Sequence, residues 1–171
     1  MTTLNHGSFS LNFGFITLTG NLTDEDRQCA WEFYVELSTR VAVTGKRDDP
    51  DCKNFEGELY VESLDSLYSF FKESRKIMRK FPVGRILANN NNHLGALINR
   101  ALNDVIRRFL ERWHVAYRYW WENESNKLVP PIERQRLFPE HEKFINEWTD
   151  VRWLMRRLAE EIIKVYRLIP A

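Results

Sequence analysis

The last third of the chain carries a heptad pattern, which restricts the possible folds more than any other feature of the sequence. Bulky side chains recur every seven residues at His141, Trp148, Met155, Ile162 and Ile169, with Phe144, Val151, Leu158 and Val165 between them. Such a repeat forms one continuous seam along a helix, and that seam packs against other helices. We predict a helix over about residues 139–168 that lies inside a bundle.

Three further segments show helical periodicity and are long enough to pack along this helix. The first covers about residues 24–44, where Thr23 offers a cap and acidic residues fill the first turn. The second covers about residues 58–80, and the third about residues 93–122. Four amphipathic helices and three connections predict an all-α, up-down-up-down four-helix bundle over residues 23–171.

The residues before the first helix show a different pattern. Apolar and polar side chains alternate over residues 8–19 with a period of two, which is typical of a short strand. We expect residues 1–22 to form an extended N-terminal arm. A strand needs a pairing edge, so this arm lies across the bundle, folds into a small hairpin or pairs with a partner chain.

Charge is balanced over the whole chain but not along it. The 25 Lys and Arg against 24 Asp and Glu give a net charge of +1, which offers no electrostatic support for a nucleic acid or membrane partner. Residues 1–71 hold 5 basic and 12 acidic side chains, whereas residues 72–119 hold 11 basic and 3 acidic ones. Antiparallel helices bring these two segments together, so we expect them to pair internally.

Several kinds of site lack their usual residues. Cys29 and Cys52 form neither a disulfide framework nor a metal-binding spacing, and the chain has no glycine-rich phosphate loop. We therefore expect no cofactor and no metal. No apolar run approaches about 18 residues and the N-terminus lacks a signal-peptide pattern, so we expect a cytoplasmic protein.

The stretch WHVAYRYWWENE, residues 113–124, concentrates aromatic side chains. On a helical wheel Trp113, Tyr117 and Trp120 continue the apolar stripe of the helix, which favours a place in the core over a stacking surface. Tyr119 points to the opposite flank and Arg118 points outward. These two side chains are candidates for contact with a partner.

His114 lies at the border of the apolar stripe, and two motifs include it. Glu111-x-x-His114 is a unit that binds metal in di-iron bundles, but those sites need a second such unit, which this sequence lacks. The string RFLERWH, from Arg108 to His114, resembles the arginine-histidine motif of the all-α HEPN ribonucleases. That resemblance implies a metal-independent ribonuclease, in which His114 takes the ribose 2′-hydroxyl proton and an arginine stabilises the phosphorane.

The choice of arginine in that motif is open. On an unbroken helix Arg108 lies about 120° from His114, whereas Arg107 lies within about 20° of it but has six residues between. The usual polar residue after the arginine is also replaced by Phe109.

Other side chains indicate a second buried surface. Trp153 and Ile163 lie off the heptad seam and are expected to face outward, while Arg75 and Arg79 belong to a basic run at the end of the second helix. Cations at a helix C-terminus are stabilised by the helix dipole, so a solvated helix end is the favoured explanation of the basic run, and binding to nucleic acid or another polyanion is the alternative. The predicted partner-binding residues are Tyr119, Arg118, Trp153, Ile163, Arg75 and Arg79.

The strings AWEFYVELSTRVAV, SLDSLYSFF and LNDVIRRFLERWHVAYRYWW resemble a family of small uncharacterised helical proteins from cyanobacteria and actinobacteria, which look like accessory components of bacterial conflict or antiviral operons. The resemblance spans most of the first three expected helices and implies an adaptor without an active site. We therefore predict a non-catalytic protein-interaction or accessory module with a protein partner or a second copy of itself. The alternative is a HEPN-like ribonuclease that uses His114 with Arg107 or Arg108.

Overall fold

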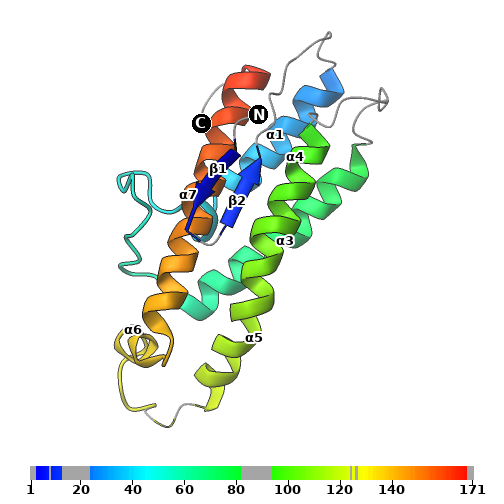
Figure 1. The fold of residues 1–171 in the computed structure, drawn as a ribbon. Helices are drawn as coiled ribbons and strands as arrows, with labels where there is room; N and C mark the ends of the chain where they lie inside the picture. Colours follow the sequence, from blue (N-terminus) through cyan, green and yellow to red (C-terminus); the bar gives the residue numbers. More distant parts are fainter. Residues whose placement is uncertain are drawn as a thin grey trace.

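The computed structural model describes residues 3–7, 9–12, 24–81, 94–123, 125 and 127–168, and it confirms the predicted all-α class, with one small hairpin added (Figure 1). The longer helices are α1 (Asp24–Ser38), α3 (Tyr60–Lys80), α4 (Leu94–Arg100), α5 (Arg108–Asn123) and α7 (His141–Tyr166). The shorter ones are α2 (Val41–Thr44), α6 (Pro131–Arg134) and the 3-10 turn η2 (Gln135–Leu137).

Helix α7 lies at the centre of the described packing. It contacts α1, α2 and α5, and α3 in turn contacts α1, α2 and α5. The seam predicted from the heptads is buried at Trp148, Val151, Met155, Leu158 and Ile162, which are all fully inaccessible to solvent. The predicted seam is therefore part of the core, because removing an apolar stripe of this length from water stabilises the fold.

The first predicted helix is interrupted. The sequence indicates one helix over residues 24–44, but α1 ends at Ser38 and Arg40 adopts extended backbone angles before α2 begins. The indole of Trp148 donates to the Ala42 carbonyl at 2.8 Å, and Arg156 donates to the Thr44 carbonyl at 2.9 Å. These tertiary contacts satisfy carbonyls that the end of a short helix leaves without partners.

The third predicted helix is continuous but not α-helical throughout. Between α4 and α5, the segment η1 (Ala101–Arg107) is a π-helix, in which the turn is wider than in an α-helix. Its Asn103 side chain donates to the Asn99 carbonyl at 2.9 Å. π-helical turns are rare in proteins, and those that occur often lie at functional sites. The surroundings of η1 are therefore a candidate location for a functional site.

The N-terminal residues form a hairpin on the helices. Strands β1 (Thr3–His6) and β2 (Phe9–Asn12) pair antiparallel, with His6 opposite Phe9. Gly7 in the turn has φ of 53°, which glycine adopts without strain, and a Cβ there would lie 1.8 Å from Asp150 Oδ2 and would displace that carboxylate. The hairpin alternative is thus the one observed, although β1 precedes the predicted strand and residues 13–19 of it lie outside the described residues.

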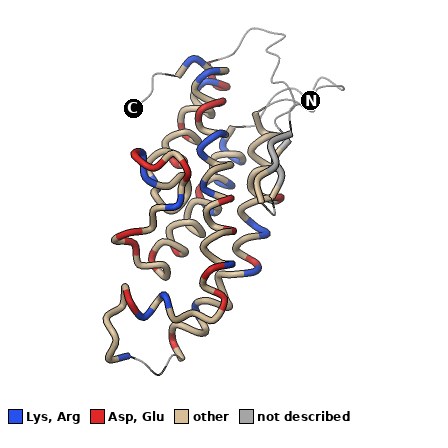
Figure 2. Tube along the Cα trace, turned by 60° about the vertical axis from the view of Figure 1, so that its left-hand side comes forward, with Lys and Arg blue, Asp and Glu red and all other residues tan. Residues whose placement is uncertain are grey.

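Positions of Lys and Arg are interspersed with positions of Asp and Glu along the folded helices, as the coloured Cα trace in Figure 2 shows. Lys80 bonds Glu32 of α1 at 2.7 Å, and Arg118 of α5 pairs with Asp65 of α3. The expected pairing between the acidic and basic segments is therefore present at these positions. Among the described helices, none combines the length and apolar character that a membrane span needs.

Candidate binding groove

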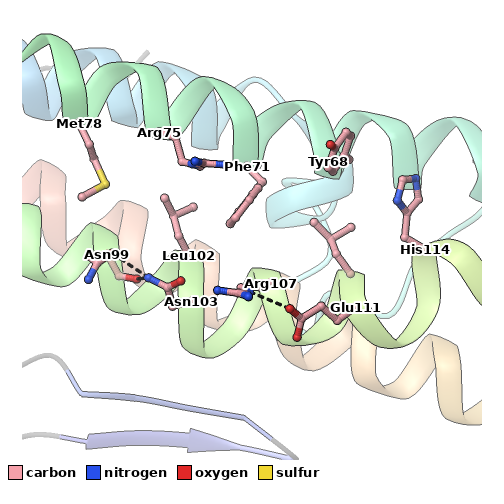
Figure 3. Close-up of a pocket in the computed structure, with 11 residues that line it drawn as sticks. Tyr68, Phe71, Arg75, Met78, Asn99, Leu102, Asn103, Arg107, Glu111 and His114 are labelled. Carbon is pink, nitrogen blue, oxygen red and sulfur yellow. Dashed lines mark hydrogen bonds and ion pairs between the residues drawn. The ribbon is translucent and has the colours of Figure 1, made fainter.

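A groove of about 560 Å³ runs between α3 and the continuous helix of α4, η1 and α5 (Figure 3). Tyr68, Phe71, Arg75 and Met78 line it from α3. The facing helix contributes Asn99, Leu102, Asn103, Arg107, Leu110, Glu111 and His114. We call this site the arginine groove, after the two arginines that enter it from opposite sides.

The floor of the arginine groove is apolar. Phe71 and Met78 are seven residues apart on one side of α3, and both are half-buried. Leu102 and Leu110 on the facing helix are buried and belong to the core. The same amphipathic spacing that packs α3 against its neighbour therefore also gives the groove an apolar base.

The two arginines differ in whether a carboxylate pairs with them. Arg107 Nε donates to Glu111 Oε1 at 2.7 Å, and both side chains are more than half exposed. The Arg75 guanidinium carbon lies 5.7 Å from the centroid of the Phe71 ring, and no carboxylate of the described residues pairs with it. Arg107 is thus neutralised by its own helix, whereas Arg75 presents an unpaired charge at the groove.

His114 closes one end of the arginine groove. Its Nε2 lies 3.2 Å from Asp65 Oδ1, the oxygen that Arg118 also contacts, and its ring stacks on Tyr68 with the centroids 5.2 Å apart. If Nε2 carries the proton and donates to Asp65, the other ring nitrogen is left as an acceptor. The arrangement resembles a histidine held by a carboxylate, which general-base chemistry uses.

Exposed cations continue along α3 beside the groove. Lys72, Arg75 and Arg79 are all exposed and are spaced by three and four residues, so they share one face of the helix. The Lys72 ammonium lies 5.5 Å from the centroid of the Tyr68 ring. This face of α3 therefore offers a row of positive charge next to an apolar floor.

The structure brings some of the predicted site residues together and separates others. Arg75, Arg107 and His114 line the arginine groove, and Arg118 adjoins it through Asp65. Arg108 is exposed but does not line the groove, so the described geometry favours Arg107 over Arg108 as the partner of His114. Arg79 shares the exposed face of α3, and Tyr119 is 69% exposed on α5, away from the groove lining.

Two predicted partner-binding residues are less exposed than their spacing suggests. Trp153 and Ile163, which we expected to face outward, are both half-buried against the core. The ring of His6 lies 4.5 Å from that of Trp153, so the chain's own N-terminal hairpin covers part of this surface. A helical wheel cannot show this cover, because the hairpin comes from a distant part of the sequence.

Asp65 and Tyr68 are site residues that the motif analysis missed. Both lie on α3, one turn apart, and both contact His114. The available signal was the charge pattern, because Asp65 belongs to the acidic segment and His114 and Arg118 belong to the basic one. The contact between Asp65 and His114 joins residues 49 positions apart, so it depends on the packing of the two helices and not on a local motif.

The aromatic stretch of α5 is mainly core. Trp113 and Tyr117 are 1% and 0% exposed, and burial raises the pKa of the Tyr117 hydroxyl well above its usual range. Trp113 donates its indole N–H to Glu147 at 2.7 Å. Over the described part of the chain, no three His, Cys, Asp or Glu side chains converge as metal ligands do.

Comparison with protein families, with curated proteins and with solved structures found no match for this chain. The arginine groove is therefore interpreted from its own chemistry.

Proposed function

We propose that this protein is a non-catalytic interaction module that binds a partner protein through the arginine groove, as an accessory component of a bacterial defence system would. The observation that carries the proposal is the convergence of Arg75 and Arg107, from two separate helices, on one groove with an apolar floor. An apolar centre with charged side chains at its rim is the usual composition of a protein interface, and arginine is enriched there.

The proposed scaffold is an up-down-up-down four-helix bundle. Its members are α1, α3, the continuous helix of residues 94–123, and α7. The contacts of α3 with α1 and α5, and of α7 with α1 and α5, support this arrangement. A bundle of this kind holds the two walls of the groove at a fixed separation, because each wall also packs into the core.

Site-specific photocrosslinking tests the proposal. A photoreactive amino acid replaces Asn103, which is exposed and lines the groove, or Glu160, which is exposed on α7 outside it. In cells of the native host we expect one crosslinked protein from position 103 and none of the same mass from position 160. Charge reversal by Arg75→Glu with Arg107→Glu should abolish that product, and its persistence would contradict the proposal.

A ribonuclease is the second candidate, and one specific observation favours it. Arg107 and His114 line the same groove, and His114 is bonded to Asp65. In that reaction His114 accepts the 2′-hydroxyl proton, the 2′-oxygen attacks phosphorus, and the 5′-oxygen leaves with a proton from water while Arg107 stabilises the phosphorane. The products carry a 2′,3′-cyclic phosphate and a free 5′-hydroxyl.

The two candidates differ in their response to His114→Ala. A ribonuclease would lose the formation of cyclic-phosphate ends on a single-stranded RNA, measured by mass spectrometry of the products. An interaction module would form no such ends in either protein, and its crosslink at position 103 would survive the substitution.

A further inference from the structure

We infer that the arginine groove receives an acidic, amphipathic helix of the partner, an inference that rests on the proposed function. The helix would place its apolar face on the groove floor and its carboxylates beside the arginines. Three features of the groove support this occupant: its length, its row of charges and its apolar base.

The groove has the dimensions of a short helix. Its lining residues run from Asn99 to His114 on one wall, a span of about 22 Å, and from Tyr68 to Met78 on the other, about 15 Å. A helix of three to four turns can lie along both walls and place the anchors of one face in the groove, as in the helix-in-groove mode of recognition.

The charges along the rim select an acidic occupant. Lys72, Arg75 and Arg79 follow one face of α3 and make no ion pair with another described residue. On a docked helix, glutamates three or four residues apart recur at the same spacing as these cations. The planar guanidinium of Arg75 suits a carboxylate in particular, because it can donate two parallel hydrogen bonds to it.

On the opposite wall, Glu111 already occupies the place beside Arg107 that a carboxylate of the docked helix would take. Glu111 accepts from Arg107 at 2.7 Å, and both side chains are exposed. Exposed ion pairs of this kind contribute little to the stability of the fold. A glutamate of the docked helix can therefore replace Glu111 on Arg107 at a small cost in free energy.

The groove floor favours a protein segment over a nucleic acid strand. Phe71 and Met78 are half-buried and apolar, as an aliphatic anchor requires. The Arg75 guanidinium carbon lies 5.7 Å from the centroid of the Phe71 ring, so a base stacked on that side of the ring would compete with Arg75 for it.

A peptide titration on the full chain tests the inference. The probe is a fluorescein-labelled helix-forming peptide of about 15 residues, with leucines on one face and glutamates on both flanks. One control peptide has the same composition with the leucines scattered around the helix, and another has lysine in place of glutamate. Binding is followed by fluorescence anisotropy, and a uridine oligonucleotide of equal net charge is titrated in parallel.

We expect saturable binding of the acidic peptide and weaker binding of both control peptides. Arg75→Glu with Arg107→Glu should weaken the acidic peptide about tenfold or more and should strengthen the lysine peptide. The matched control variant, Arg27→Glu with Lys164→Glu, changes the net charge equally at exposed positions outside the groove, and should stay within about twofold of wild type.

Three results would overturn the inference: no saturable binding of the acidic peptide, equal losses in both double variants, or tighter binding of the oligonucleotide that depends on Arg75 and Arg107. The photocrosslink at position 103 separates this inference from the proposed function. A partner crosslinked there, without binding of the acidic peptide, would leave the interaction module standing and reject the acidic helix.

Discussion

Two arginines in different parts of this fold have opposite environments. Arg152 of α7 is fully buried, with its guanidinium carbon 3.8 Å from the Phe55 ring centroid and its Nη2 2.5 Å from Glu58. Arg75 of α3 is exposed, lies over Phe71 and has no carboxylate partner among the described residues. The first fixes the loop before α3 to α7, whereas the second remains available to a ligand.

Burial decides whether a charged side chain acts in stability or stays available for recognition. A buried charge must be paired and bonded, because desolvation otherwise costs more than the fold can supply. An exposed, unpaired arginine above an apolar floor has no comparable structural role. Substitutions in the buried region should therefore destabilise the fold, whereas substitutions of exposed groove residues should not.

The largest effect is expected for Arg152→Met. The substitution leaves Glu58, whose side chain is 11% exposed, without its guanidinium partner. We expect a loss of about 3–5 kcal/mol in the free energy of unfolding, measured by urea denaturation. Adding Glu58→Met should recover part of the loss, and a loss below about 1 kcal/mol in the single variant would contradict the assignment.

Glu147→Ala should cost about 2 kcal/mol, because it leaves the buried indole N–H of Trp113 without an acceptor and also removes the partner of Arg112. Glu111→Ala is the matched control in the groove, where the carboxylate pairs with exposed Arg107. We expect that variant to stay within about 0.5 kcal/mol of wild type in urea denaturation. Equal losses in the two variants would remove the contrast between the buried region and the groove.

Gly7→Ala should release the N-terminal hairpin at a cost of about 1–2 kcal/mol, because the new Cβ would collide with Asp150. Amide hydrogen exchange of β1 and β2 measures the effect. Gly57→Ala is the control, since Gly57 also has positive φ, of 76°, but a Cβ there meets no atom within 4 Å. If both variants leave the exchange of β1 and β2 unchanged, the close contact with Asp150 does not hold the hairpin.

A pH effect is expected from His141, whose Nε2 lies 3.3 Å from the Tyr60 hydroxyl. Burial, followed by the nearby positive charge of Arg136, lowers the pKa of His141 below 6.5. The unfolded chain therefore protonates His141 more readily than the folded protein does. Neutral His141 contributes its full stabilisation of the folded state above about pH 6.5, and this stabilisation is lost as the pH falls toward the lower pKa of the folded state. His141→Gln should flatten the free energy of unfolding between about pH 6.5 and 5, and parallel pH profiles for the two proteins would contradict this.

The smallest effect on stability is expected for Arg75→Ala. Its side chain is exposed and unpaired, so the free energy of unfolding should change by less than about 0.5 kcal/mol. A larger loss in urea denaturation would show that Arg75 is a structural residue like Arg152.

Much of the helical architecture could be predicted from local pattern. The periodicity of residues 58–80 and 139–168 places α3 and α7 within two residues of their observed bounds. The break at Arg40 and the π-helical segment η1 could not be predicted, because both depend on packing against other elements. The hairpin was one of three alternatives, and its docking depends on Gly7 meeting Asp150 across the chain.

The site was less accessible to sequence reasoning than the fold. The wheel puts Arg107 and His114 on one flank of a single helix, and both line the arginine groove. It could not show that Arg75 faces them from α3, nor that Asp65 holds His114. Such contacts join residues of separate helices, and only the packed structure specifies them.

The most direct test of the account is the yield of partner crosslinking through position 103 in the single variant Arg75→Glu. The account predicts that the crosslinked product is lost while the variant unfolds at the same urea concentration as wild type. An undiminished product would contradict the claim that Arg75 is the free charge through which this protein binds its partner.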